Sequence, residues 1–218
     1  VLLEVDVPPR LGPTAQVTCH VCLVDGCCPR GRLVSTVSLH LPSRRPRVFR
    51  IGGGASDTIR PGCTYTVCFG GLCVEDARFR IGRFRTPSAC LESRLRVVAV
   101  SGDWPHCLAP GEPSLWRMLR DRVRAPYIDS VDPIDFVLHA GGQSWMGDAF
   151  EDAWDLLRWR AMEPMLCADG GWEEAQEEAT ERLREAVRLS WSLPDKRVVL
   201  SSTSNLMLCG AADVHPEF

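Results

Sequence analysis

The sequence DFVLHAGGQSW, residues 135–145, contains a short apolar run that ends in two glycines. A run of this length, bounded by turn-forming residues, is typical of a strand buried in a parallel sheet. Apolar runs at residues 95–100 and 206–209 predict two more buried strands. Because segments of helical periodicity lie between the runs, we expect helical crossovers and an α/β domain over residues 91–218.

The segments between these strands predict three helices with one apolar side each. The longest, residues 172–191, carries glutamates on the side opposite its apolar stripe. Carboxylates in that position point to water, so we interpret the glutamate run as a solvated helix face and not as a metal site. The three apolar stripes are Leu115, Met118, Leu119 and Val123; Phe150, Trp154, Leu157 and Ala161; and Ala175, Ala179, Leu183 and Val187.

The first part of the chain, residues 1–90, has short strand-like segments separated by glycine and proline clusters. This pattern is typical of a β-sandwich. Its most specific piece is residues 59–67, a turn that enters a strand with Tyr65 on one face. The piece resembles the tyrosine corner of fibronectin type III domains, so we predict a structural role for Tyr65. The candidate strands are residues 15–24, 33–41, 48–51, 64–69 and 79–84.

Composition excludes several classes of protein. The 218 residues are 45% hydrophobic and 24% charged, which is unlike a disordered, collagen-like or coiled-coil chain. No apolar run approaches the ~20 residues of a membrane-spanning helix, so we expect a soluble protein. Residues 1–90 carry 12 basic and 6 acidic side chains, whereas residues 91–218 carry 13 and 22. Since the arginines of the first part alternate along strands, a solvated strand face explains them and nucleic acid is not the expected partner.

The 11 cysteines bear on the compartment. Cys19 and Cys22, followed by a further cysteine pair, have a spacing similar to that of zinc ligands. They fall on opposite faces of a predicted strand, however, so buried, reduced thiols are the preferred interpretation and zinc and disulfides the alternatives. The odd count and the lack of a signal-peptide pattern slightly favour an intracellular location. The chain begins at Val1 and not at a methionine, so the alternative expectation is that it has lost a leader or is a fragment.

The carboxyl ends of the three predicted strands carry residues 101–103, 139–145 and 210–213. Their order and spacing resemble the PhoD-like alkaline phosphatases, a branch of the calcineurin-like metallophosphatases. Residues 135–145 are similar to the family's "LHLGDQ" strand, and residues 205–218 to its "MMWDDHE" strand. Residues 82–86 resemble its junction between sandwich and catalytic domain. The resemblance implies a β-sandwich before a metallophosphatase-like α/β domain that is incomplete at its C-terminus, and a phosphoesterase that uses divalent metals or iron plus calcium.

This sequence departs from that family at the metal positions. Gly102 stands where a cysteine often ends the first strand, Gly142 where the second motif has its aspartate, and Trp145 where a tyrosine follows. A two-metal phosphoesterase needs carboxylates to bridge its cations, and glycine or alanine offers no ligand atom. Only Asp103 keeps an acid at a matched position, so we expect no metal cofactor. The two aspartates and the histidine of the third motif correspond to Gly210, Ala211 and Ala212.

We therefore expect a catalytically inactive phosphatase homologue that acts as a binding or scaffold protein. Asp103, His139 and Gln143 form its candidate residual polar site, and we expect Asp103→Ala to leave folding nearly unchanged. The alternative is an active metal-dependent phosphomonoesterase or phosphodiesterase whose remaining ligands lie outside this chain or at unmatched residues. A third hypothesis treats the arginine-rich sandwich as a module that binds anions or nucleic acid. The residues outside the matched motifs that could form a different metal site are His106, His139, Asp148, Asp213 and His215.

A partner protein is expected to cover the incomplete sheet, because a sheet cut after its third strand exposes an apolar edge. The seven tryptophans bear on the same question, since they cannot all fit one small core. They either line a partner surface or fill the former active-site cleft. The tryptophans concerned include Trp104, Trp116, Trp145 and Trp159.

Overall fold

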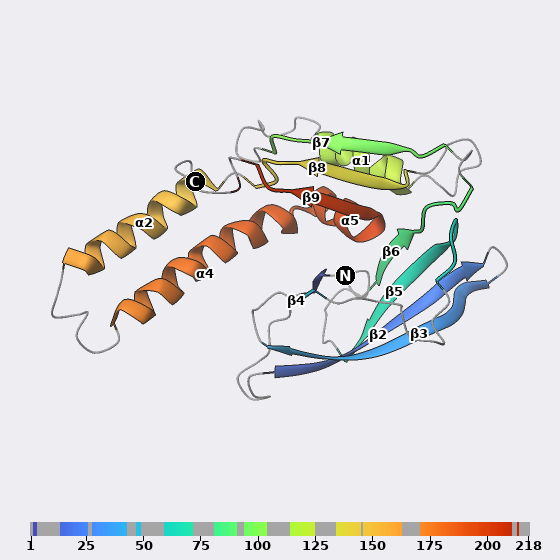
Figure 1. The fold of residues 1–218 in the computed structure, drawn as a ribbon, viewed down its shortest axis with the longest axis horizontal. Coiled ribbons are helices and arrows are strands. Elements are labelled where there is room, and N and C mark those ends of the chain that lie inside the picture. The colour runs from blue at the N-terminus through green and yellow to red at the C-terminus, as the bar shows by residue number, and fades with distance from the viewer. Residues whose placement is uncertain are drawn as a thin grey trace. The chain divides into compact units, whose positions relative to one another are not determined.

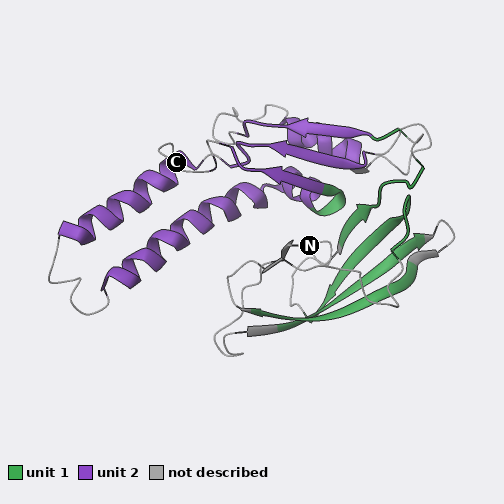
Figure 2. Cartoon of the chain, in the orientation of Figure 1, with its two compact units in different colours: residues 1–95, 201–204 green, residues 96–200, 205–218 purple. Residues whose placement is uncertain are grey.

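A computed structural model of the chain describes residues 2–3, 14–25, 28–42, 47–48, 59–71, 81–90, 94–103, 114–124, 134–144, 146–162, 171–210 and 213. The chain divides into two compact units (Figure 2). Unit 1 comprises residues 1–95 and 201–204, and unit 2 comprises residues 96–200 and 205–218.

Unit 1 contains a four-stranded antiparallel sheet in the order β3-β2-β5-β6 (Figure 1). Its strands are β2 (Thr14–Asp25), β3 (Cys28–Pro42), β5 (Thr64–Gly70) and β6 (Ile81–Arg85). A separate antiparallel pair consists of β1 (Leu2–Leu3) and β4 (Arg47–Val48).

Three of the predicted strands of unit 1, residues 15–24, 33–41 and 64–69, are confirmed. Of the predicted strands at residues 48–51 and 79–84, the described residues are Val48 and 81–84, and both lie in strands. The more specific assignment to a fibronectin type III-like sandwich stays a prediction.

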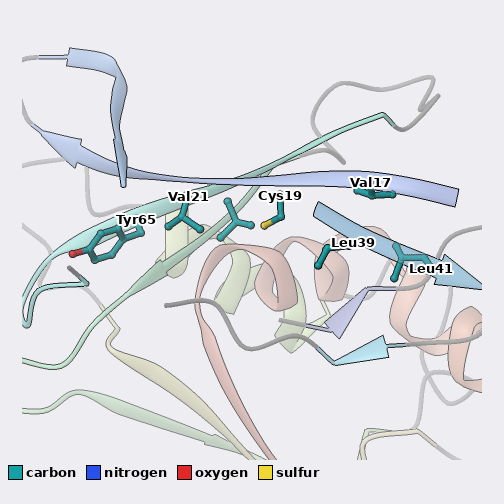
Figure 3. Close-up of a cluster of buried hydrophobic side chains, with 7 residues drawn as sticks. Val17, Cys19, Val21, Leu39, Leu41 and Tyr65 are labelled. Atoms are coloured by element: carbon teal, nitrogen blue, oxygen red, sulfur yellow. The ribbon is translucent and has the colours of Figure 1, made fainter. Parts of the chain in front are cut away.

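The core of unit 1 follows from the two-residue period of its strands. Alternate residues of β2, β3 and β5 point to the same face, where they exclude water and pack together. Tyr65 is the largest side chain of this core and is fully buried. Figure 3 shows this cluster, whose labelled members are Val17, Cys19, Val21, Leu39, Leu41 and Tyr65.

The hydroxyl of Tyr65 turns back to the chain that enters β5. It accepts a hydrogen bond from the main-chain N–H of Arg60 at 2.6 Å. The hydroxyl of Thr86 donates to the carbonyl oxygen of the same Arg60, also at 2.6 Å, and the Tyr65 ring stacks on Phe84 with 5.2 Å between centroids. The buried phenol is therefore satisfied locally, as the tyrosine-corner prediction requires, and its role is structural.

Unit 2 contains a three-stranded sheet in the order β7-β8-β9 (Figure 1). β7 and β8 run parallel, with Val98 opposite Val137. The strands are β7 (Val97–Val100), β8 (Phe136–Ala140) and β9 (Ser204–Leu208). The helices are α1 (Leu115–Arg124), α2 (Gly147–Met162), α4 (Gly171–Ser192) and α5 (Pro194–Ser202).

The core of unit 2 lies where α1 and α5 meet β8. Val137 of β8 and Val199 of α5 are fully buried, and Trp116, Leu119 and Val123 of α1 pack against them. The spacing of the α1 residues is that of one helix face, which is why a ten-residue helix covers this strand. The three predicted helices are confirmed, but the sequence analysis missed α5.

The sheet of unit 2 departs from the prediction of fully buried strands. Along β7 the side chains alternate between exposed and half-buried, and Val97 is 42% exposed. The predicted third strand exists as β9, but Leu206 and Leu208 are 54% and 57% exposed. The alternation on β7 is typical of a sheet that is covered on one face only. The apolar run therefore predicted the strand correctly but overestimated its burial.

Two further properties concern the whole described part of the chain. None of its helices is long and apolar enough to cross a membrane. Its cysteines are free thiols, of which Cys19 is buried and Cys90 and Cys209 are exposed. The prediction of reduced thiols therefore agrees with this part of the structure, although burial holds only for Cys19. Burial raises the pKa of the Cys19 thiol, which keeps it protonated and unreactive.

Candidate functional site

The loops that follow β7 and β8 are joined by main-chain hydrogen bonds. The N–H of Gly102 donates to the carbonyl oxygen of Gly141 at 3.3 Å, and the N–H of Asp103 donates to that of Gly142 at 2.7 Å. The Ser101 hydroxyl also lies 3.3 Å from the Gly141 oxygen. This is the sheet end at which α/β proteins commonly bind ligands, and here backbone contacts backbone across it.

The backbone at this sheet end favours glycine at positions 141, 142 and 210. A Cβ atom at position 210 would lie 2.7 Å from the Cα of Gly141 and 2.9 Å from the nitrogen of Gly142. Gly142 has a φ of +63°, and a Cβ atom there would lie 3.0 Å from the nitrogen of Gly102. An aspartate at position 142 or 210 would therefore force these loops apart.

Lys196 lies beneath these loops and is fully buried. Its ammonium group donates to a carboxylate oxygen of Asp103, to the main-chain carbonyl of Gln143 and to the Ser190 hydroxyl, the last at 2.8 Å. The three N–H donors of the ammonium group thus have three acceptors. A buried charge persists only when it is paired and hydrogen-bonded in this way.

The indole of Trp116 completes the environment of Asp103. Its Nε1–H donates to the second carboxylate oxygen at 2.9 Å, and the ammonium of Lys196 lies 5.3 Å from the indole centroid. The imidazole of His139 stacks on the other side of the network, 6.0 Å from the indole centroid. We call Asp103, Trp116, His139, Lys196 and Asn205 the Lys196 cluster.

Asn205 determines the tautomer of His139. The Asn205 side-chain amide donates to the carbonyl of Leu200 at 3.1 Å, so its oxygen is the atom that faces Nε2 of His139 at 2.9 Å. Nε2 therefore carries the hydrogen and donates. With a donating Nε2 and almost no exposure, His139 is a satisfied core residue, as its place within the strand predicted.

Burial changes the acid–base properties of the two basic members of the cluster. Desolvation lowers the pKa of Lys196, and the hydrogen bond and charge of Asp103 oppose this shift. Desolvation also lowers the pKa of His139, and the nearby positive charge of Lys196 acts in the same direction. His139 is therefore held neutral, while Asp103 supplies the charge that keeps Lys196 protonated.

Asp213 occupies a second polar position at the same sheet end. One carboxylate oxygen accepts main-chain N–H bonds from Gly142 at 2.8 Å and Gly210 at 3.0 Å. The other accepts from Gln143 at 2.7 Å and Ser144 at 3.1 Å. Four N–H groups that converge on one point form an anion-binding nest, and the chain fills it with its own carboxylate.

The residues at this sheet end do not fit the divalent metals, or the iron and calcium, that the resemblance implies. Asp103 is engaged by an ammonium group and an indole N–H, and the carboxylate of Asp213 is surrounded by main-chain donors. A side chain at position 210 would clash with the backbone of Gly141, and one at position 142 would require a left-handed backbone and press on Gly102. Among the residues that the structure describes, no group of three or more histidine, cysteine, aspartate or glutamate side chains could hold a metal ion.

The structure brings the three candidate residues of the residual polar site together through Lys196. Asp103 and the Gln143 carbonyl bind its ammonium group directly, and His139 joins through Trp116. Asp148, an unmatched candidate ligand, is an exposed residue in the first turn of α2. The predictions for Trp104, His106, Trp145, Ala211, Ala212 and His215 lie outside the described residues.

The sequence analysis missed Lys196, the residue that organises the site. A signal was present, because Lys196 is the only lysine of the chain, against 24 arginines. Trp116 is one of the tryptophans expected either at a partner surface or in the former active-site cleft. It is 9% exposed and belongs to the core. Trp159, by contrast, is 51% exposed.

Comparison with known proteins gives one match of fold. No family model matches the chain, and no curated protein matches its sequence. A solved structure of PhoD is similar to it, with a TM-score of 0.50 and 10% sequence identity over 96% of this chain and 35% of that chain. The chain thus has a distant PhoD-like fold and spans about a third of the length of that structure.

Proposed function

We propose that this chain uses a phosphatase-like fold without metal catalysis, as a binding or scaffold protein. The observation that carries the proposal is the engagement of Asp103 by Lys196. A lysine ammonium supplies one fixed positive charge to this carboxylate, but it can neither activate a water molecule nor stabilise a leaving oxygen as a metal ion does. Lys196 therefore supplies the positive charge that a buried carboxylate needs, but it does not supply the metal-ion chemistry that hydrolyses a phosphate ester.

The edge of the sheet supports the binding role. In the described part of the chain β9 has one neighbouring strand, β8, and three consecutive side chains of β9, from Leu206 to Leu208, are exposed. An open strand edge with apolar side chains is a template for an added strand. We propose that an extended segment of a partner protein pairs with β9 and covers these side chains.

The alternative function is that of a metal-dependent phosphomonoesterase or phosphodiesterase that takes its remaining ligands from outside this chain. It requires Asp103 to exchange a buried ammonium and an indole donor for a metal ion. Elemental analysis distinguishes the two functions. The protein is purified from its own source, and its metal content and native mass are measured on one sample.

The proposal expects no stoichiometric iron, zinc, manganese or calcium, and a native mass above 24.2 kDa that is due to a bound partner. One or two equivalents of metal, together with phosphatase activity that a chelator abolishes, would overturn the non-catalytic function. A metal-free chain that sediments as a monomer would agree with the non-catalytic function but would contradict the proposed partner at β9.

A further inference from the structure

Helices α2 and α4 form an antiparallel hairpin in which the two helices lie side by side (Figure 1). They approach each other through small residues, because Ala153, Ala175 and Ala179 are buried. The large apolar side chains of the hairpin are in part exposed, with Trp154 at 55% and Met162 at 71%. Exposed apolar surface of this kind marks an interaction site.

A groove of about 710 Å³ runs between the two helices. Phe150, Ala153, Trp154 and Leu157 of α2 line it, and their spacing of three, four and seven residues places them on one helix face. From α4, Leu183 continues the apolar lining, together with Ala179. The groove therefore has an apolar floor about two helical turns long.

The rim of the groove is negative. Glu173 and Glu177 of α4 line it. The two helices together carry ten acidic residues and five arginines. Arg184 pairs with Glu177 at 3.2 Å and offsets part of this charge. Further arginines pair with Glu178, Glu181 and Asp155 in the same way. The two helices keep a net negative charge, which favours an occupant of positive charge.

We propose that the α2–α4 groove binds a basic amphipathic helix of a partner protein. The apolar side of that helix lies between Trp154, Leu157 and Leu183, and its lysine or arginine residues face the glutamates of the rim. This is the helix-in-groove mode of recognition, in which anchors spaced three, four and seven residues apart enter an apolar trough. Tryptophan is the residue type that most often dominates the binding energy of such a contact.

Charge argues against other occupants. Nucleic acid and anionic membrane surfaces would be repelled by the negative rim. The same hairpin of a second copy carries the same negative charge, so hairpin-to-hairpin dimerisation is disfavoured. The groove lies on α2 and α4 and does not involve the Lys196 cluster, so this inference stands or falls independently of the proposed function.

The test uses the whole chain and a synthetic peptide. The peptide has about 18 residues of leucine and lysine, with leucines on one helix face, and its matched control has glutamate in place of every lysine. Fluorescence anisotropy measures binding of each labelled peptide at low and high salt. We expect micromolar binding of the lysine peptide that weakens severalfold as salt is added, and no binding of the glutamate peptide.

Two variants locate the contact. Trp154→Ala should weaken binding of the lysine peptide about tenfold or more. The double variant Glu173→Gln with Glu177→Gln should weaken it about fivefold and reduce its salt dependence. Asp121→Asn with Glu185→Gln removes two charges outside the groove lining and should bind as the parent does. Circular dichroism checks that each variant is folded.

Three outcomes would overturn the inference. The first is equal binding of the two peptides, and the second is unchanged affinity in both groove variants. The third is dimerisation of the chain, seen in sedimentation, that Trp154→Ala abolishes and the lysine peptide does not compete with, because the groove would then serve a second copy.

Discussion

Two buried polar regions, the corner around Tyr65 in unit 1 and the Lys196 cluster in unit 2, are built on different principles. The Tyr65 hydroxyl is neutral and bonds to Arg60, five residues away in sequence. The Lys196 ammonium is charged and bonds to Asp103, 93 residues away. The Tyr65 hydrogen bond forms within one turn of the chain, whereas the Lys196–Asp103 pair forms only when the whole of unit 2 is folded.

The difference in charge sets the free energy at stake in each region. A neutral hydrogen bond contributes about 0.5–1.5 kcal/mol to stability, and its loss leaves one buried group unsatisfied. Removal of one partner of a buried ion pair leaves a whole charge without compensation, at a cost of about 3–5 kcal/mol. Substitutions in the Lys196 cluster should therefore lower the free energy of unfolding more than substitutions at the Tyr65 corner.

The largest effect is expected for Asp103→Ala. The variant leaves the ammonium of Lys196 buried without its counter-charge, so the free energy of unfolding should fall by about 3–5 kcal/mol in urea denaturation. This corrects the expectation from sequence that Asp103→Ala leaves folding nearly unchanged. That expectation treated Asp103 as a loop residue after a strand, without a buried cation beneath it.

A double variant separates the loss of the pair from the loss of shape. Asp103→Leu together with Lys196→Met replaces both charges by apolar groups of similar size, and it should recover much of the stability that Asp103→Ala loses. If Asp103→Ala unfolds within about 1 kcal/mol of the parent, Lys196 does not depend on this carboxylate and the comparison between the two regions fails.

The same comparison explains what the sequence could predict. The turn before Tyr65, its strand and the existence of α1 follow from local patterns, and each of them appears in the structure. The predicted apolar stripe of α1 was wrong in part, because Leu115 and Met118 are 80% and 65% exposed and Trp116 takes their place in the core. The predicted α/β order of unit 2 also relies on local periodicity. The Lys196 cluster has no local pattern, since its members come from five separate places in the chain.

Lys196 also lies on the helix that the sequence analysis missed. α5 has nine residues, begins at Pro194 and follows α4 almost directly, so its periodicity is too short to predict a separate element. The close approach of Gly210 to Gly141 was equally hidden, because a glycine in sequence does not tell which backbone passes over it. Long-range packing, and not local preference, determines both features.

A smaller effect is expected at the local corner. Tyr65→Phe removes the hydroxyl that accepts from Arg60, and should lower the free energy of unfolding by about 1–2 kcal/mol because the Arg60 N–H loses its partner. Hydrogen exchange at the Arg60 amide should accelerate in the same variant. Equal stability of Tyr65→Phe and the parent, with unchanged exchange at Arg60, would contradict the tyrosine-corner role.

The smallest effect is the pH dependence contributed by His139. Burial lowers the pKa of His139 in the folded state, so below pH 6.5 the unfolded chain binds a proton that the folded chain does not. The stability from this group is complete above pH 6.5 and is lost as pH falls from there to the lower folded pKa.

A His139→Gln variant isolates this contribution, because all other titrating groups are shared with the parent. The free energy of unfolding by which the parent exceeds the variant, measured by urea denaturation, should shrink as the pH is lowered from 7 to 5. The reason is that desolvation, together with the positive charge of Lys196, lowers the pKa of His139 by more than the Asn205 hydrogen bond and the negative charge of Asp103 raise it. A difference that stays constant or grows over this range would mean that His139 is charged in the fold, and that Asp103 divides its charge between two buried cations instead of serving Lys196.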